Sequence, residues 1–254
     1  MITVQDVLSY LETIAPPSLK MDWDNIGLLC GNSNQEVHKI LVALDPFISV
    51  CQEAADICAD LIVTHHPLIF GGVQSVTNET PTGRSVLFLA SHNISAVNAH
   101  TNLDCASGGV NDVLAETLGL SEIQAIEPGL LRQGIVPKQS LEGFLSSVKS
   151  NLGCPGLRYV SGGKPVNKIA VGGGSCASEL MDVAKAGCDT FVTADVKYNQ
   201  FWDAQELGIN LIDAGHFYTE NPVCQVLQKK LQENFPEIPV EFSKIHTDCA
   251  NFFF

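Results

Sequence analysis

The sequence predicts an α/β protein in which two similar α/β lobes pack around a central metal-binding cleft. Short apolar, β-branched runs alternate with helical patterns, which is the signature of a parallel or mixed sheet. Part of this pattern occurs twice, which indicates internal duplication. In both copies, histidine and acidic residues follow apolar runs, at the strand ends where open α/β sheets gather their binding sites.

The first predicted lobe covers residues 1–122. Thr3 is placed to cap a helix that carries apolar side chains on one face as far as Ile14, where Pro16 and Pro17 end it. A turn at 23–31 leads into a short strand. Beyond it, the pattern predicts strands at 39–45, 61–63 and 94–100 and helices at 49–59, 84–92 and 111–118.

When the sequence is compared with itself at a shift of 129 residues, several short motifs match in the same order. Short apolar strings match by chance, but the preserved order of the matches favours duplication. The second lobe is therefore predicted at 165–254, and 123–164 is predicted to be a connecting segment with one helix at 141–152. At this shift Lys39-Ile40 matches Lys168-Ile169, and Val63-Thr64 matches Val192-Thr193. His100-x3-Asp104 matches His216-x3-Glu220 at an offset of 116, because the second copy lacks 13 loop residues after its strand end.

Two adjacent histidines, His65 and His66, follow the apolar run at 61–63. Neighbouring side chains of a strand point to opposite faces, so the two imidazoles reach one site only if the backbone turns. Pro67 supplies such a turn. The pair therefore indicates metal ligation, and the alternative is two surface histidines in a loop.

If equivalent strand ends of the two lobes face each other, five candidate ligands meet in the cleft. Five ligands are more than one tetrahedral zinc ion needs. A set of imidazoles and carboxylates without a thiolate suits two divalent cations. Zinc, manganese, iron, cobalt and nickel all remain open. Glu220 has an alternative role at the start of a helix, where a carboxylate is favourable. The five residues are His65, His66, Asp104, His216 and Glu220.

Two further features bear on catalysis. His100 is a candidate proton shuttle, with a role in orienting Asp104 as the equal alternative. The Gly172-Gly173-Gly174 run follows a strand and formally fits a phosphate-binding loop, where a nucleotide's phosphates would lie. A tight strand-to-helix turn without a ligand is the favoured interpretation of that loop.

Composition narrows the class of protein. The net charge is −14, with only 14 Lys and Arg, which disfavours binding to nucleic acid. We see no signal peptide and no membrane span. The nine cysteines include no Cys-x2-Cys pair, which argues against a zinc knuckle or a disulfide framework and favours a cytoplasmic location.

The chain resembles the Ngg-interacting-factor-three-like family, whose bacterial members are named GTP cyclohydrolase 1 type 2 homologues. The resemblance covers essentially the whole chain. It implies two similar lobes, a dinuclear metal centre held by the five residues above with Glu220 touching both ions, and a ring-shaped homohexamer. The motifs that carry it are Asp24-Asn25-x-Gly27-Leu28, Thr64-His65-His66-Pro67-Leu68, Ala99-His100-Thr101-x2-Asp104 and Asp213-Ala-Gly-His216-x3-Glu220.

Three functions are consistent with such a site. The first is a metal-dependent hydrolase of a nucleotide or purine-like small molecule, because paired cations activate water. The alternative from another class is a non-catalytic, metal-dependent scaffold or regulatory protein that binds a protein partner. A metal-carrying protein is the third, and the absence of flexible His/Cys tracts counts against it.

Overall fold

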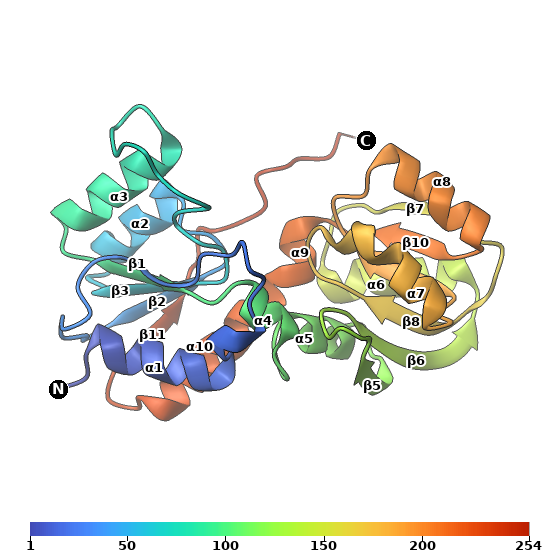
Figure 1. Cartoon of the computed structure of the whole chain (residues 1–254), viewed down its shortest axis with the longest axis horizontal. Coiled ribbons are helices and arrows are strands. Elements are labelled where there is room, and N and C mark those ends of the chain that lie inside the picture. The colour runs from blue at the N-terminus through green and yellow to red at the C-terminus, as the bar shows by residue number, and fades with distance from the viewer. Residues whose placement is uncertain (254) are drawn as a thin grey trace. The chain divides into compact units, whose positions relative to one another are not determined.

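The computed structural model describes residues 1–253 and divides into two compact units. The first unit comprises residues 1–107 and 223–247, and the second comprises residues 108–222 together with the described residues from 248 onward. Each unit is built on its own sheet with helices on both faces (Figure 1). The predicted α/β class is therefore confirmed, with two sheets.

The sheet of the first unit has five strands in the order β1-β4-β3-β2-β11. Four strands run parallel, and β1 pairs antiparallel with β4 at one edge. The three central strands are buried along their whole length, as expected of a sheet covered on both faces. The strands are β1 (Gly27–Cys30), β2 (Ile40–Ala43), β3 (Leu61–Thr64), β4 (Ser95–Asn98) and β11 (Val240–Phe242).

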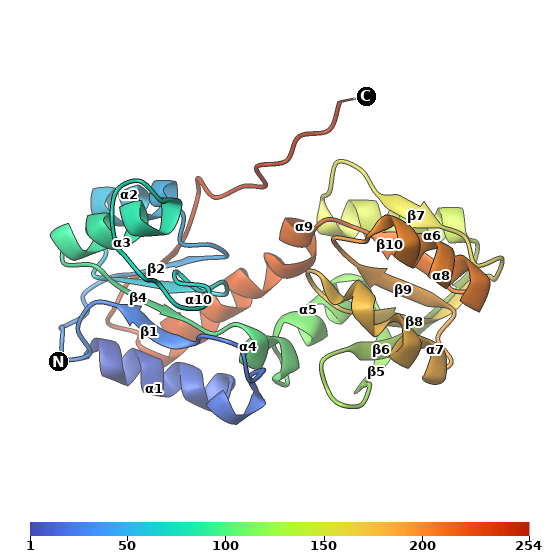
Figure 2. The same cartoon turned by 45° about the horizontal axis from the view of Figure 1, so that its top comes forward.

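Helices α2 and α3 cover one face of this sheet, and α1 and α10 cover the other (Figure 2). Thr3 caps α1 as predicted, with its hydroxyl accepting from the amide of Asp6. Tyr10 joins α1 to the end of α10 through a hydrogen bond to the carbonyl of Lys230. The helices are α1 (Val4–Ile14), η1 (Pro17–Leu19), α2 (Ile48–Asp56), α3 (Pro81–Ser91), α4 (Thr101–Cys105) and α10 (Pro222–Asn234).

The sheet of the second unit has six strands in the order β5-β6-β8-β9-β10-β7. Strands β8, β9 and β10 are parallel, and the strands flanking them on either side are antiparallel. The strands are β5 (Ser121–Ala125), β6 (Arg132–Gln139), β7 (Arg158–Val160), β8 (Val166–Val171), β9 (Thr190–Thr193) and β10 (Asn210–Asp213).

Alternate side chains of this second sheet enter two separate cores. Phe144 of α6 packs on Ile169 and Val192 in one core, while Leu180 of α7 packs with Phe191 in the other. The helices are α5 (Val110–Thr117), α6 (Leu141–Leu152), η2 (Cys176–Glu179), α7 (Leu180–Lys185), α8 (Tyr198–Leu207) and α9 (His216–Glu220).

The two sheets share an arrangement of four strands. In each, three consecutive parallel strands are flanked by an antiparallel strand that precedes them in sequence: β1 beside β4, and β7 beside β10. In each sheet, an aspartate carboxylate accepts a backbone hydrogen bond at the equivalent position. Asp60 accepts from the amide of Lys39, and Asp189 accepts from the amide of Lys168.

The boundaries of the units differ from the predicted lobes at 1–122 and 165–254. The segment 123–164 is not a connector, because β5, β6 and β7 all belong to the second sheet. Strand β11 lies in the predicted second lobe but pairs with β2 of the first unit. The edge strands β5 and β7 are largely exposed, so they lack the apolar pattern that reveals a buried strand. The helix expected at 141–152 is confirmed as α6.

None of the helices that the described residues form is long and apolar enough to cross a membrane.

Candidate metal centre

Strand β3 delivers the two adjacent histidines. Its residues are fully buried, and the chain turns directly after Thr64, whose hydroxyl donates to the carbonyl of His66 at 2.7 Å. The amide of His66 donates to the carbonyl of Leu44, at the end of the neighbouring strand β2. This turn brings both imidazoles together, with ring centroids 4.9 Å apart.

His100 completes a cluster of three imidazoles within the first unit. Its ring centroid lies 5.2 Å from that of His65 and 5.6 Å from that of His66. One ring nitrogen from each of the three histidines lies within 4.8 Å of the other two, which is close enough for all three to reach one cation. These residues come from the ends of the neighbouring strands β3 and β4, as the sequence predicts for a site at the strand ends.

Each imidazole of this cluster is held at Nδ1 by an oxygen. The partners are the carbonyl of Ala99 for His65, at 3.0 Å, and the carboxylates of Asp45 for His66, at 2.7 Å, and of Asp24 for His100, at 2.8 Å. A carbonyl or carboxylate oxygen accepts only, so Nδ1 carries the proton and the lone pair lies on Nε2. Metal-binding histidines have this second hydrogen bond almost without exception.

The two carboxylates are held in their charged form. Burial alone would raise the pKa of Asp24, but hydrogen bonds from His100 and Thr101 outweigh burial and hold that pKa well below its usual value. Asp45 behaves in the same way: burial opposes ionisation, while hydrogen bonds from His246 and His66 lower its pKa. Both therefore remain acceptors at neutral pH.

His246 is a part of this network that sequence reasoning missed. Its Nε2 lies 2.9 Å from the second oxygen of Asp45, so one carboxylate joins His246 to His66. The segment after β11 is held in place by Ser243, which donates to Glu53 and accepts from the amide of His246. Because 201 residues separate His246 from Asp45, no local motif could have signalled the pair.

Asp104 lies on α4, with its Oδ1 3.6 Å from Nε2 of His65. It thus lies beside the imidazole cluster, where the sequence predicts a ligand. The ring of His100 is hydrogen-bonded to Asp24, and the backbone amide of Asp104 donates to the carbonyl of His100.

The second unit holds the remaining predicted ligands on one short helix. His216 and Glu220 begin and end α9, and their Nε2 and Oε2 atoms lie 2.9 Å apart. Nδ1 of His216 lies 2.7 Å from Asp195, which gives it the same anchored geometry as the other three histidines. Glu220 is buried, and the next helix, α10, starts only at Pro222.

The glycine loop supports these ligands and leaves little room for a phosphate. The amide of Gly172 donates to Val192, that of Gly173 to Asn111, and that of Gly174 to Thr219. Since these donors are already used, the expectation that nucleotide phosphates lie here is not supported by the hydrogen bonds. The loop instead allows close approach, because a Cβ on Gly174 would lie 2.1 Å from the carboxylate of Glu220.

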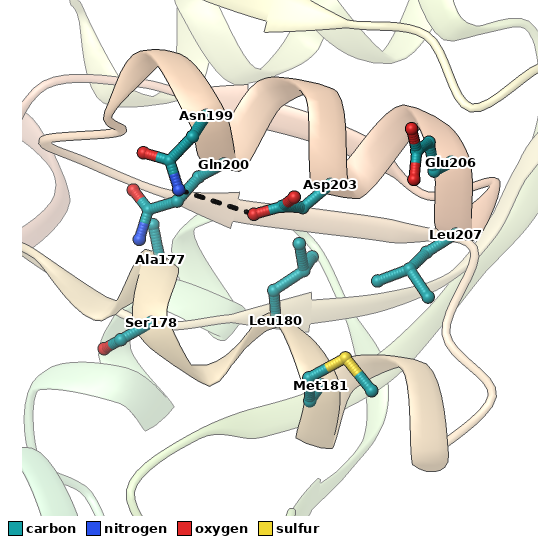
Figure 3. Close-up of a pocket in the computed structure, with 9 residues that line it drawn as sticks. All are labelled: Ala177, Ser178, Leu180, Met181, Asn199, Gln200, Asp203, Glu206 and Leu207. Atoms are coloured by element: carbon teal, nitrogen blue, oxygen red, sulfur yellow. Dashed lines mark hydrogen bonds between the residues drawn. The ribbon is translucent and has the colours of Figure 1, made fainter.

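A cavity of the second unit lies away from these residues. It has a volume of about 480 Å³ and lies between α7 and α8, and Figure 3 shows Leu180 of α7 pointing toward α8, which carries Asp203 and Leu207. Asn199 and Asp203 on its rim bond to each other at 3.5 Å. None of the predicted site residues lines it, so it adds nothing to the candidate metal centre.

Comparison with known proteins places these features in a family. The model of the family described as Duf34/NIF3 (NGG1p interacting factor 3) matches residues 2–249. A Clostridium perfringens protein named GTP cyclohydrolase 1 type 2 homolog is 36% identical over 248 residues, covering 94% of each chain.

Two solved structures are similar over nearly the whole chain. A Staphylococcus aureus hypothetical protein superposes with a TM-score of 0.91 at 30% identity and covers 99% of both chains. Reduced HcgD from Methanocaldococcus jannaschii gives a TM-score of 0.84 at 30% identity and covers 96% of this chain and 98% of its own.

Proposed function

Because this chain belongs to the Duf34/NIF3 (NGG1p interacting factor 3) family, we propose that it is a dinuclear metal-dependent hydrolase acting on a nucleotide or purine-like small molecule. The proposed ligands are His65, His66 and Asp104 from the first unit and His216 and Glu220 from the second. His100 is the proposed proton shuttle.

The observation that carries the proposal is the common anchoring of the histidines. His65, His66, His100 and His216 each have Nδ1 within 3.0 Å of an oxygen acceptor, so the electron pair that can bind a cation lies on Nε2 in each. Imidazoles combined with the carboxylates of Asp104 and Glu220 form a donor set that fits borderline divalent cations.

We propose that the two units descend from one ancestral α/β unit and contribute equivalent strand ends to a shared site. The common four-strand arrangement and the equivalent backbone hydrogen bonds to Asp60 and Asp189 support duplication. In both units a His-x3-acid motif follows the third parallel strand, with His100 and Asp104 after β4 and His216 and Glu220 after β10.

Divalent cations bound there would supply an acidified water molecule and polarise the bond under attack. The protein's own contribution is positioning and proton transfer. His100 has the geometry of a shuttle, because its Nδ1 is held by the buried carboxylate of Asp24, which places the lone pair that can take up a proton on Nε2. Asp45 and Asp195 keep His66 and His216 in the tautomer that binds metal.

The proposed substrate class rests on the relatives' name and on charge. The Clostridium perfringens relative is named a GTP cyclohydrolase 1 type 2 homolog, which points to a guanine nucleotide or a related ring compound. The net charge of −14 disfavours nucleic acid as the substrate.

The proposal is tested by metal analysis followed by a turnover screen. Elemental analysis of purified protein should give two divalent ions per chain, and His66→Ala and Glu220→Ala should each lose metal while His38→Ala, an exposed imidazole, should not. The metal-loaded protein should then hydrolyse a member of a panel of nucleotides and purines, with loss of turnover in chelator. Full metal without turnover over the whole panel would favour the scaffold alternative.

We also propose that the protein assembles as a homohexamer. Light scattering coupled to gel filtration measures the mass directly, and the chain mass of 27.3 kDa sets the scale. A mass of one chain in solution would contradict this assembly.

A further inference from the structure

A second cavity of the first unit adjoins the imidazole cluster. It has a volume of about 280 Å³ and shares Asp45 with the hydrogen-bond network of His66. Its wall continues from His66 through the loop at 67–70. The residues that define its chemistry are Asp45, Phe47, Pro67, Leu68, Phe70 and Arg84.

Aromatic side chains at this cavity are unusually exposed. Phe47 retains 55% and Phe70 retains 69% of its surface in water. Phe70 also lies next to Trp23, itself 61% exposed, at a centroid distance of 5.7 Å, and 6.2 Å from the ring of His100. An aromatic surface therefore runs from the cavity to the candidate metal centre, and such a surface stacks planar rings.

Arg84 gives the cavity a positive charge and forms no ion pair with any described residue, although the carboxylate of Asp45 lines the same cavity. Its guanidinium donates to the carbonyl of Asn78 at 3.1 Å and to no acid. Arg132 and Arg158, by contrast, pair with Asp112 and Asp213. In a chain with 28 acidic and 14 basic residues, an arginine without a counter-ion is suited to an anionic ligand.

We propose that this cavity binds a planar heteroaromatic ring carrying one anionic group, with the ring against Phe47 and Phe70 and the anion at Arg84. The carboxylate of Asp45 repels the anion and so orients the ligand toward Arg84. The volume is slightly below that of a typical drug-sized pocket, so it suits one ring system and excludes a dinucleotide. The inference rests on the proposed function only in taking this ligand as the substrate.

Two probes that differ only in the anion test the assignment. Calorimetry on the metal-loaded full chain should show GMP binding about tenfold or more tighter than guanosine, as expected for a charge-assisted contact. Arg84→Gln should abolish this preference and leave guanosine binding unchanged. Phe70→Ala should weaken both probes about tenfold, because it removes a stacking surface. Lys229→Gln removes an equal charge at an exposed position of α10 and should change neither affinity.

Metal content of the same samples separates this inference from the proposed function. Normal metal in every variant, with GMP bound equally well by the wild type and Arg84→Gln, would overturn the cavity assignment alone. Failure of the wild type to bind either probe would overturn it too. Arg84-dependent GMP binding in a protein that holds no metal would support the cavity and contradict the metal-dependent function.

Discussion

Substitution of Gly174 by alanine should displace a proposed metal ligand. Gly174 has a φ of +60°, and a Cβ there would lie 2.1 Å from Oε1 of Glu220 and 3.0 Å from Nε2 of His216. Gly187 provides a matched control, because its φ is +72° and its Cβ would meet nothing within 4 Å. The two substitutions thus share the backbone strain and differ only in the steric clash.

The magnitudes follow from these contacts. An L side chain in the left-handed region costs about 1 kcal/mol, so both variants should lose roughly that much free energy of unfolding, and Gly174→Ala should lose more because its Cβ also clashes. Ordinary contact begins at 3.4 Å, so the carboxylate of Glu220 must move by the difference from 2.1 Å, which is 1.3 Å. A carboxylate displaced by about 1 Å no longer fits a metal's coordination distance, and affinity should fall by about a hundredfold.

Two measurements on both variants separate strain from ligand displacement. Urea unfolding of the metal-free proteins gives the free energy of unfolding, and competition with a chromophoric chelator gives the metal affinity. Gly187→Ala should bind metal as the wild type does. If Gly174→Ala matched it in metal affinity, Glu220 would not be a ligand and the role assigned to the glycine loop would be wrong.

Further predictions concern the network behind the imidazoles and the thiols. His246→Ala should weaken metal binding about tenfold, because it removes a hydrogen bond to Asp45. His246→Gln can still donate to Asp45 and should keep most of the metal affinity. Equal affinity of the wild type and both variants in chelator competition would exclude this positioning role. The free energy of unfolding of the metal-free protein should fall as pH drops below about 4. The pKa values of Asp24 and Asp45 are lower in the folded state, so the unfolded chain takes up protons first as the pH falls. Urea titrations of Asp24→Asn should show a shallower fall. Exposed Cys58 should react with a thiol reagent well before Cys51, whose pKa burial raises to about 11, and labelling followed by peptide mass spectrometry would contradict this if Cys51 reacted first.

The elements that the sequence predicts best are those with a continuous apolar run or a clear apolar face. The strand carrying His65 and His66, the first helix and the helix at 141–152 all have strong periodicity and clear caps or turns, and all are present as β3, α1 and α6. The spacing of His216 and Glu220 also predicts their position on one helical turn, which α9 confirms.

The elements that were missed depend on long-range pairing. Strands β5 and β7 are exposed edge strands with no apolar alternation, and β11 has only three residues. Asp24 and His246 reach their histidine and carboxylate partners across 76 and 201 residues, so neither pair has a local pattern. Such residues lie in segments without hydrophobic periodicity, and the sequence of these segments does not show which residue they contact.

The central claim is that residues of both units hold the same cations. Metal affinity should therefore be measured for the wild type, His66→Ala, Glu220→Ala and the double variant, because residues that share a centre give non-additive losses. We expect each single variant to lose most of the affinity and the double variant to lose little more than either. Losses that add fully, or single variants that keep two ions per chain, would show that the two units do not share a metal centre.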